Sequence, residues 1–290
     1  TSGSDGIQSI KSSKLPEQSS PHGATRRQGC EALQIASIQQ LGSYLLGENG
    51  QQFQRPALEM LIALWQSQTE GIRSTTSNWL DLSDTEGRRT ATGEWLNAVA
   101  DIQNSVLARA ITYALLAKEN RGLLLLAEFL PQQSLTGFRT DFPGLKPLKL
   151  WNCNLDGIDL QGGKLYKAEL QGASLFGAQM NGAELNSTRL QGANLNSSAL
   201  QHARLHGAHL QGAVLRFVQA KYSSFNSANL QDADLYWAGL EFAELESADL
   251  QGARLFEARI QGASLRNADL RGTSIINPLV NEQTRFDQAI

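Results

Sequence analysis

From Leu155 to Val280 the chain places a large apolar residue at every fifth position. Of the 26 positions spaced in this way, 20 are leucine, and only Ala220 is small. The residue two positions before each of these centres is usually alanine, so the unit reads A-x-L-x-x. Neither an α-helix nor a plain β-strand repeats every five residues. Strict repetition of this kind predicts a solenoid, in which each unit buries its apolar face by stacking on its neighbours.

The five-residue unit predicts one side of a square coil. Four extended sides, each ending in a turn, return the chain to its starting direction, so residues 20 apart stack at a strand spacing of about 4.8 Å. Gln-Gly follows the central residue at corners ten residues apart, which favours type II turns because glycine readily adopts positive φ. The corners between them, such as LNSS at 195–198, mostly lack this glycine and are expected to form type I or irregular turns.

This repeat resembles that of the pentapeptide-repeat family, whose units read A-(D/N)-L-x-x. Matching triplets are ANL at 193–195 and 228–230, and ADL at 233–235, 248–250 and 268–270. The resemblance implies a mainly β fold, a right-handed quadrilateral β-helix, over residues 150–281. Such proteins are common in cyanobacteria and photosynthetic organelles, among other bacteria, which leaves the source and compartment open. We expect a soluble protein, cytoplasmic or organellar (stroma or lumen after processing) if the source is photosynthetic.

The N-terminal half has a different pattern. Helical spacing of apolar residues over residues 28–131 predicts a small all-α domain before the solenoid. The first helix is expected to bury a stripe made of Leu33, Ala36, Ile38, Leu41 and Leu45. The helix expected over residues 92–120 presents Leu96, Val99, Val106, Ala110 and Tyr113 on one face.

The remaining segments connect or terminate these two regions. Residues 1–27 are rich in Ser, Gly, Gln and Pro and are expected to form a flexible tail. Residues 132–149 are interpreted as a linker into the solenoid. Residues 282–290 break the five-residue register and are expected to fold over the last coil as a cap.

Composition and motifs exclude several functions. The net charge of −3 over 290 residues argues against a nucleic-acid-binding surface, which would show a basic field. No apolar run approaches the roughly 20 residues that span a bilayer. His202, His206 and His209 fall on different sides of a square coil, so they do not predict a metal site. No catalytic or nucleotide-binding motif is present, so no catalytic residue, cofactor or metal is expected.

Large aromatic residues gather at positions that point outward from neighbouring coils. We call these six residues the aromatic surface: Phe217, Tyr222, Tyr236, Trp237, Phe242 and Phe256. The 20-residue period predicts that they stack in three pairs, each ring on the ring 20 positions later. Exposed aromatic surfaces are typical of interaction sites. The alternative is a ladder that stabilises the coils.

Acidic residues form a second group, with no Lys or Arg between Lys221 and Arg254. We call it the acidic patch: Asp232, Asp234, Glu241, Glu244, Glu246 and Asp249. Some members of the similar family protect DNA gyrase from quinolones by resembling DNA in shape and charge. Arginines elsewhere on the solenoid interrupt the negative field that such a mimic needs, so a solvated acidic patch is favoured.

These patterns predict a non-enzymatic interaction or scaffold protein. The β-helix would be a rigid platform, and the α domain would cover its N-terminal end, whose open strand edges otherwise invite aggregation. The expected partner is another protein, a multiprotein complex or a second copy of the chain. Two alternatives stay open: a regulator of an enzyme, such as a DNA-mimicking gyrase binder, and an activity within the α domain.

Overall fold

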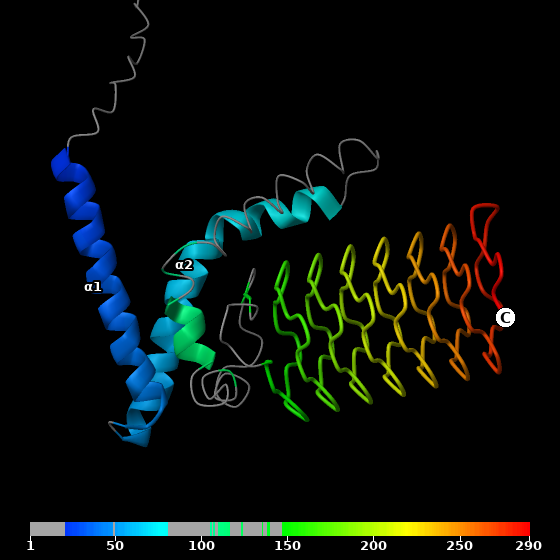
Figure 1. The fold of residues 1–290 in the computed structure, drawn as a ribbon, viewed down its shortest axis with the longest axis horizontal. Helices are drawn as coiled ribbons and strands as arrows, with labels where there is room; N and C mark the ends of the chain where they lie inside the picture. The colour runs from blue at the N-terminus through cyan, green and yellow to red at the C-terminus, as the bar shows by residue number, and fades with distance from the viewer. Residues whose placement is uncertain are drawn as a thin grey trace, which may run out of the picture.

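The computed structural model describes residues 21–48, 50–80, 105, 107, 110–116, 123, 135, 138, 139 and 147–290. Helix α1 spans Pro21–Leu45, a short 3-10 helix η1 spans Gln51–Phe53, and α2 spans Gln54–Leu80. Residues 110–116 are also helical. A solenoid of stacked coils follows and runs to the C-terminus, green to red in Figure 1.

Helix α1 begins at Pro21, before the boundary expected at residue 28, because proline suits the first turn of a helix. After the helix, Gly47 has a φ of 75° and the Gln54 side-chain amide donates to the Leu45 carbonyl oxygen at 2.9 Å. Both features satisfy the end of the helix. The expected apolar stripe is only partly buried, since Ile38 and Leu45 are buried but Leu33 is 71% exposed.

The helix at residues 110–116 buries a different face from the one predicted. Ile111 and Leu115 are fully buried, whereas Tyr113 is 46% exposed. Residues four apart share a helix face, and Tyr113 lies between them on the other side. The prediction that Tyr113 is buried was therefore wrong. Leu96, Val99 and Val106 lie outside the described residues.

The helical region meets the solenoid through aromatic and backbone contacts. The rings of Trp65 in α2 and Phe138 pack edge to face with centroids 5.5 Å apart. The backbone N–H of Leu135 donates to Asp159 at 2.7 Å, and that of Lys164 donates to Phe138 at 2.7 Å. Part of the expected linker 132–149 therefore pairs with the first coil.

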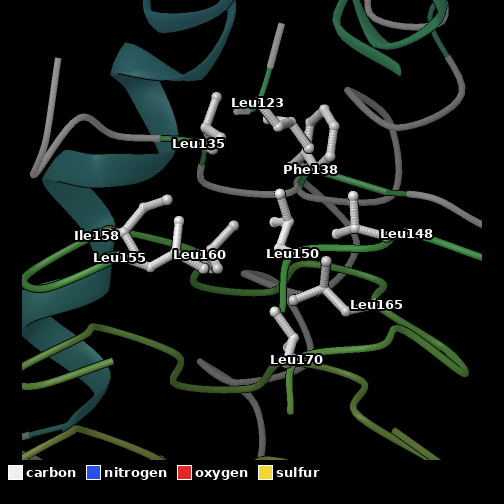
Figure 2. Close-up of a pocket in the computed structure, with 10 residues that line it drawn as sticks. All are labelled: Leu123, Leu135, Phe138, Leu148, Leu150, Leu155, Ile158, Leu160, Leu165 and Leu170. Carbon is white, nitrogen blue, oxygen red and sulfur yellow. The ribbon is translucent and has the colours of Figure 1, made fainter. Parts of the chain in front are cut away.

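Figure 2 shows the apolar side chains at this junction. Leu123, Leu135 and Phe138 lie above the first coils and are buried there. They enclose a small apolar cavity of about 20 Å³. The remaining lining residues are Leu148, Leu150, Leu155, Ile158, Leu160, Leu165 and Leu170. Apolar side chains therefore cover the N-terminal end of the solenoid, as the sequence predicted.

The solenoid has the predicted register of 20 residues per coil. Parallel bridges join residues 20 apart from Lys149 with Glu169 to Arg259 with Leu279. The central leucines and the alanines two positions before them form one continuous core along the axis. Ala220 takes the place of a leucine and is fully buried, and so is Phe225 at the next centre, which the sequence suggests as a filler.

Hydrogen bonds explain the Asn or Asp that precedes several of the centres. The backbone N–H groups of Leu190 and Gly192 donate to the next coil at 2.7 and 2.9 Å, and that of Ala193 closes the turn. At several corners the N–H directly after a centre donates to an Asn or Asp side chain instead. The Asn229 side chain accepts from the Gln231 N–H at 3.1 Å. The Asn or Asp of the repeat thus accepts a hydrogen bond from a backbone N–H group that has no partner in the ladder between coils.

The corners are more uniform than the sequence predicted. Positive φ recurs at every fifth residue from Asn152 to Asn277, whether or not that residue is glycine. In the LNSS corner, Ser197 has a φ of 56° and the Ser198 N–H donates to Leu195 at 3.1 Å. These are features of a type II turn. The expected type I or irregular turns were therefore wrong, because bonds to both neighbouring coils hold every corner in the same conformation.

The C-terminal segment continues the solenoid instead of capping it. Ser264 pairs with Arg285, which is 21 residues later rather than 20. The N–H of Ile290 donates to Ala268 at 3.1 Å, so the ladder continues after a one-residue shift. Phe286 and Ile290 are 41% and 75% exposed. The expectation that residues 282–290 fold over the last coil was wrong.

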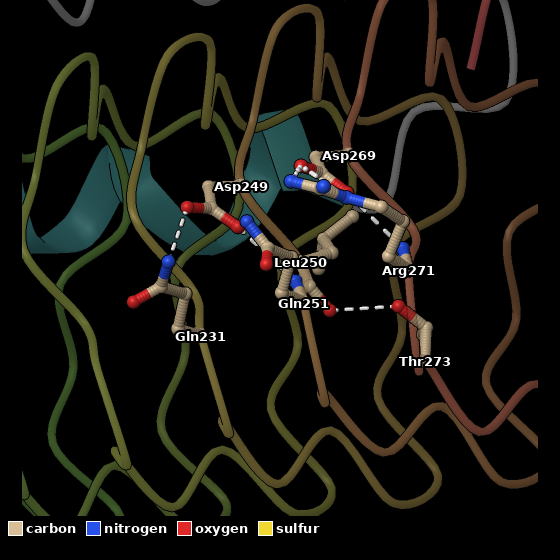
Figure 3. A network of polar contacts seen from close by, with 7 residues as sticks. All are labelled: Gln231, Asp249, Leu250, Gln251, Asp269, Arg271 and Thr273. Atoms are coloured by element: carbon tan, nitrogen blue, oxygen red, sulfur yellow. Dashed lines mark hydrogen bonds and ion pairs between the residues drawn. The ribbon is translucent and has the colours of Figure 1, made fainter. Parts of the chain in front are cut away.

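Polar side chains form a second ladder outside the core, shown for one corner in Figure 3. The Gln231 amide donates to the Asp249 carboxylate at 2.6 Å. In the next coil the Arg271 guanidinium donates to Asp269, also at 2.6 Å. This hydrogen bond holds the pKa of Asp269 below its usual value and raises that of Arg271.

Arg271→Gln is expected to return the Asp269 pKa toward its ordinary value. A carboxyl whose pKa is lower in the folded than in the unfolded chain stabilises the fold above the unfolded pKa, and this contribution is lost as pH falls through the folded value. The measurement is an NMR titration of the aspartate carboxyl carbons. Arg254→Gln, on another ladder, is the control. An Asp269 titration unchanged by Arg271→Gln would contradict the assignment.

Candidate functional site

Four aromatic residues occupy one corner of three successive coils. The rings of Tyr236 and Phe256 stack with centroids 4.6 Å apart and planes 7° from parallel. Phe217 and Trp237 lie 5.0 Å apart, and Tyr236 meets Trp237 edge to face at 4.6 Å. The Trp237 indole N–H donates to the Glu257 carboxylate. This corner is therefore one connected aromatic cluster with its polar atom satisfied.

The next corner, five residues further along the chain, carries a second column of rings. His202, Tyr222 and Phe242 stack with 5.1 Å between successive centroids. The Lys221 ammonium lies 5.1 Å from the Tyr222 ring centroid and 5.8 Å from that of Phe242. The three predicted ring pairs are confirmed, two of them as stacks, whereas the Phe217 and Trp237 planes are tilted by 43°. His202 and Lys221 were missed, although the 20-residue period places His202 directly below Tyr222.

The two corners expose part of this aromatic area. Phe217, Trp237 and Phe242 are 47%, 42% and 38% exposed, while the other three aromatic rings are half-buried. Each exposed ring therefore contacts a ring of a neighbouring coil and still leaves part of its surface to solvent.

Four of the aromatic residues adopt a conformation that favours glycine. Phe217, Tyr222, Trp237 and Phe242 have φ values between 55° and 60°. Other corners of the same solenoid have glycine there, as at Gly212. The left-handed conformation costs a non-glycine residue about 1–2 kcal/mol, which is similar to the roughly 0.5–1.5 kcal/mol that an aromatic pair contributes. Apart from the apolar area that it buries, the ring–ring contact therefore gives these bulky residues little net advantage over glycine.

A glycine lies at the centre of the solenoid face between the two aromatic corners. Gly239 has no side chain and is buried. The Arg259 guanidinium lies across it, because a Cβ built on Gly239 would be 2.9 Å from Arg259 Nη2. Arg259 Nε pairs with Glu241 at 3.1 Å. At the edge of the first corner, Arg216 pairs with Asp234 at 2.6 Å, and this hydrogen bond raises the Arg216 pKa.

The acidic patch is not one surface. Asp234, Glu244 and Asp249 belong to three different bridge ladders, which run up different faces of the solenoid. Asp234 and Glu241 have arginine partners. The six predicted residues are Asp232, Asp234, Glu241, Glu244, Glu246 and Asp249. The prediction of a patch was wrong, because a turn every five residues sends acidic side chains that are close in sequence to different sides.

The other candidate groups do not form a site. His202, His206 and His209 lie at two corners and on one face of the coil, and His202 stacks on Tyr222. No group of three or more His, Cys, Asp or Glu side chains in the described part of the chain is arranged to hold a metal ion. Burial raises the pKa of the Cys153 thiol, which disfavours the reactive thiolate.

No helix among the described residues has a stretch that is long and apolar enough to cross a membrane.

Comparison with known proteins identifies the repeat. A family model of pentapeptide repeats matches eight copies over residues 153–192, 188–221 and 233–272. No curated protein matches the chain. Among solved structures, the chain is similar to HetL from the cyanobacterium Nostoc sp. strain PCC 7120, a pentapeptide repeat protein involved in heterocyst differentiation regulation. The identity is 26% over 54% of this chain and 78% of HetL, with a TM-score of 0.30.

Two further solved structures are also similar to the chain. A pentapeptide repeat protein from the Arabidopsis thaliana thylakoid lumen is 25% identical over 37% of this chain and 71% of its own, with a TM-score of 0.34. QnrB1, a plasmid-mediated fluoroquinolone resistance protein, is 18% identical over 51% of this chain and 89% of its own, with a TM-score of 0.27. The family match and the observed coil of four five-residue sides together show that the C-terminal region of this chain is built of pentapeptide repeats.

Proposed function

We propose that this is an interaction protein that docks another protein through the aromatic surface, with the β-helix as a rigid platform. The observation that carries this proposal is the placing of four bulky aromatic residues at left-handed corner positions. Glycine would relieve the backbone there, and three of the four rings still expose more than a third of their surface. Trp, Tyr and Arg, the residue types enriched in binding hot spots, all occur in this area.

The ladder interpretation accounts for less of the arrangement. Stacking explains why each ring lies on another ring. Its favourable free energy comes from covering ring surface, so it does not explain why part of these rings stays exposed. Tyr236 and Phe256 show stacking without backbone strain, since both are half-buried and neither has a positive φ. The exposed rings of Phe217, Trp237 and Phe242 therefore favour a surface that is completed by a partner.

The DNA-mimicking alternative finds less support in the geometry. A mimic needs a continuous line of negative charge, and the acidic residues here lie on several faces. Arg216 and Arg259 further interrupt the negative field around Asp234 and Glu241. An activity in the helical region has no specific observation in its favour among the described residues.

Replacing Phe217, Trp237 and Phe242 by serine together is expected to abolish capture of the physiological partner. Loss of a hot-spot residue typically weakens binding by about 2 kcal/mol or more, so three removals should reduce bound partner far more than tenfold. The measurement is quantitative affinity capture from extract of the native source, with circular dichroism to verify folding. Hydroxyl-radical footprinting of the wild-type complex should show protection of Trp237.

The matched control replaces three exposed aromatic residues at other corners. Trp151, Tyr166 and Phe176 are 53%, 44% and 51% exposed, and the Trp151 indole also donates to a glutamate. Their triple serine variant should retain the partner. Equal retention by both triple variants would show that the aromatic surface only stabilises the coils.

A further inference from the structure

We infer that the aromatic surface is built for an acidic partner segment that also carries apolar or aromatic side chains. This inference rests on the proposed docking function and adds the chemistry of the partner. Its basis is the set of cations that surrounds the rings, Arg216, Lys221 and Arg259.

The arginines face solvent and their carboxylate partners do not. The Arg216 side chain is 50% exposed, whereas that of Asp234 is only 14% exposed. The Arg259 side chain is 52% exposed, against 18% for Glu241. An approaching molecule therefore meets two guanidinium groups and not the acids beneath them. Each guanidinium has five N–H donors, so a pair with one carboxylate leaves donors for a second one.

Lys221 adds a third positive charge between the rings. Its ammonium lies over the Tyr222 and Phe242 rings and makes a cation–π contact with each. An ammonium held over ring faces keeps its hydrogen-bond donors for an anion.

The negative groups near this surface are occupied or turned away. Glu257 accepts the Trp237 indole N–H. Glu244 lies beyond the second corner, on the next face, where its carboxylate accepts from the Asn226 amide at 2.9 Å. Gly239 lets Arg259 lie flat between the two aromatic corners, so the positive charge is at the centre of the surface and not only at its rim.

Charge complementarity then selects the partner. Aromatic rings favour apolar and aromatic side chains, and the exposed cations favour carboxylates interspersed among them. A basic partner would meet three like charges, which is unfavourable at close range.

The test measures binding of defined synthetic polymers to the full-length chain by surface plasmon resonance. The probe is a random copolymer of glutamate and tyrosine, and its counterpart is a random copolymer of lysine and tyrosine. The wild type should bind the glutamate copolymer and not the lysine copolymer. Replacing Arg216, Lys221 and Arg259 by glutamine should raise the Kd for the glutamate copolymer about tenfold, the size expected when three exposed charge contacts are lost.

The matched control removes the same net charge elsewhere on the solenoid. Arg189, Arg204 and Arg266 are exposed arginines with carboxylate neighbours at 3.7–3.9 Å. Their triple glutamine variant should bind the glutamate copolymer as the wild type does. An equal loss in both charge variants would mean that net charge alone drives binding and would overturn the inference.

Other outcomes separate this inference from the proposed function. If the serine variant of Phe217, Trp237 and Phe242 loses the glutamate copolymer but the Arg216, Lys221 and Arg259 variant retains it, the acidic partner is overturned while docking by the rings stands. A preference for the lysine copolymer, or equal binding by all variants, also overturns it. The docking function is judged separately, by partner capture.

Discussion

Leu210→Ala is expected to lower the free energy of unfolding of the solenoid by about 2–5 kcal/mol. Leu210 is fully buried on the axis of the coil, with Leu190 and Leu230 one coil away on either side. Parallel backbone ladders at 2.7–2.9 Å bind the coil on both sides, so the backbone has little freedom to close around a cavity. The measurement is equilibrium denaturation followed by circular dichroism.

Leu279→Ala is the matched control, because it removes the same atoms from a site that is 50% exposed near the C-terminal end. Its effect should stay within about 0.5 kcal/mol. In a solenoid each coil contacts only its neighbours, so Leu210→Ala should weaken hydrogen-exchange protection most in the coils next to residue 210. Similar losses from both variants would contradict the central role of the leucine column.

Gly262→Ala is the second substitution with a large expected effect, a loss of about 2–5 kcal/mol. The residue has a φ of 69°, where an alanine costs about 1–2 kcal/mol. The added Cβ would also lie 2.5 Å from the Phe242 ring, which must then move off its stack on Tyr222. Forcing an extra carbon into a packed contact typically costs a further 1–3 kcal/mol or so.

Gly212→Ala separates the two contributions. Gly212 has a φ of 63°, but nothing lies within 4 Å of an added Cβ, so only the backbone term of about 1–2 kcal/mol should appear. Denaturation of both variants, with near-ultraviolet circular dichroism as a report on Tyr222 and Phe242, checks the difference. Equal losses would show that Phe242 does not pack over Gly262.

Much of the fold could be predicted because the repeat carries its own geometry. A large apolar residue at every fifth position, with alanine two before it, is compatible with few structures other than a four-sided coil. The same period predicted which rings stack, since it states which residues lie one above another. The predictions that failed were made from single residues and not from the period. The type I or irregular turns expected at the corners without glycine were wrong, because contacts from the coils on both sides decide the conformation of Ser197 and its equivalents.

The candidate site followed the same division. The six aromatic residues and their pairing were visible in the sequence, whereas the acidic patch was an artefact of counting neighbours along the chain. The ion pairs of Arg216 and Arg259 were not predicted for the opposite reason, because each joins residues that are far apart in the sequence. Their partners, Asp234 and Glu241, are 18 residues away in the sequence and meet them only across one coil.

The sequence by itself therefore determined the period, the core and the order of residues along each column of the solenoid, because these depend only on spacing. The tertiary structure alone decided four things. They are the left-handed conformation of the corners that lack glycine, the exposure of three aromatic rings, the burial of acids beneath arginines, and the one-residue shift that lets residues 282–290 continue the coil. Each depends on contacts between neighbouring coils, which spacing along one chain does not specify.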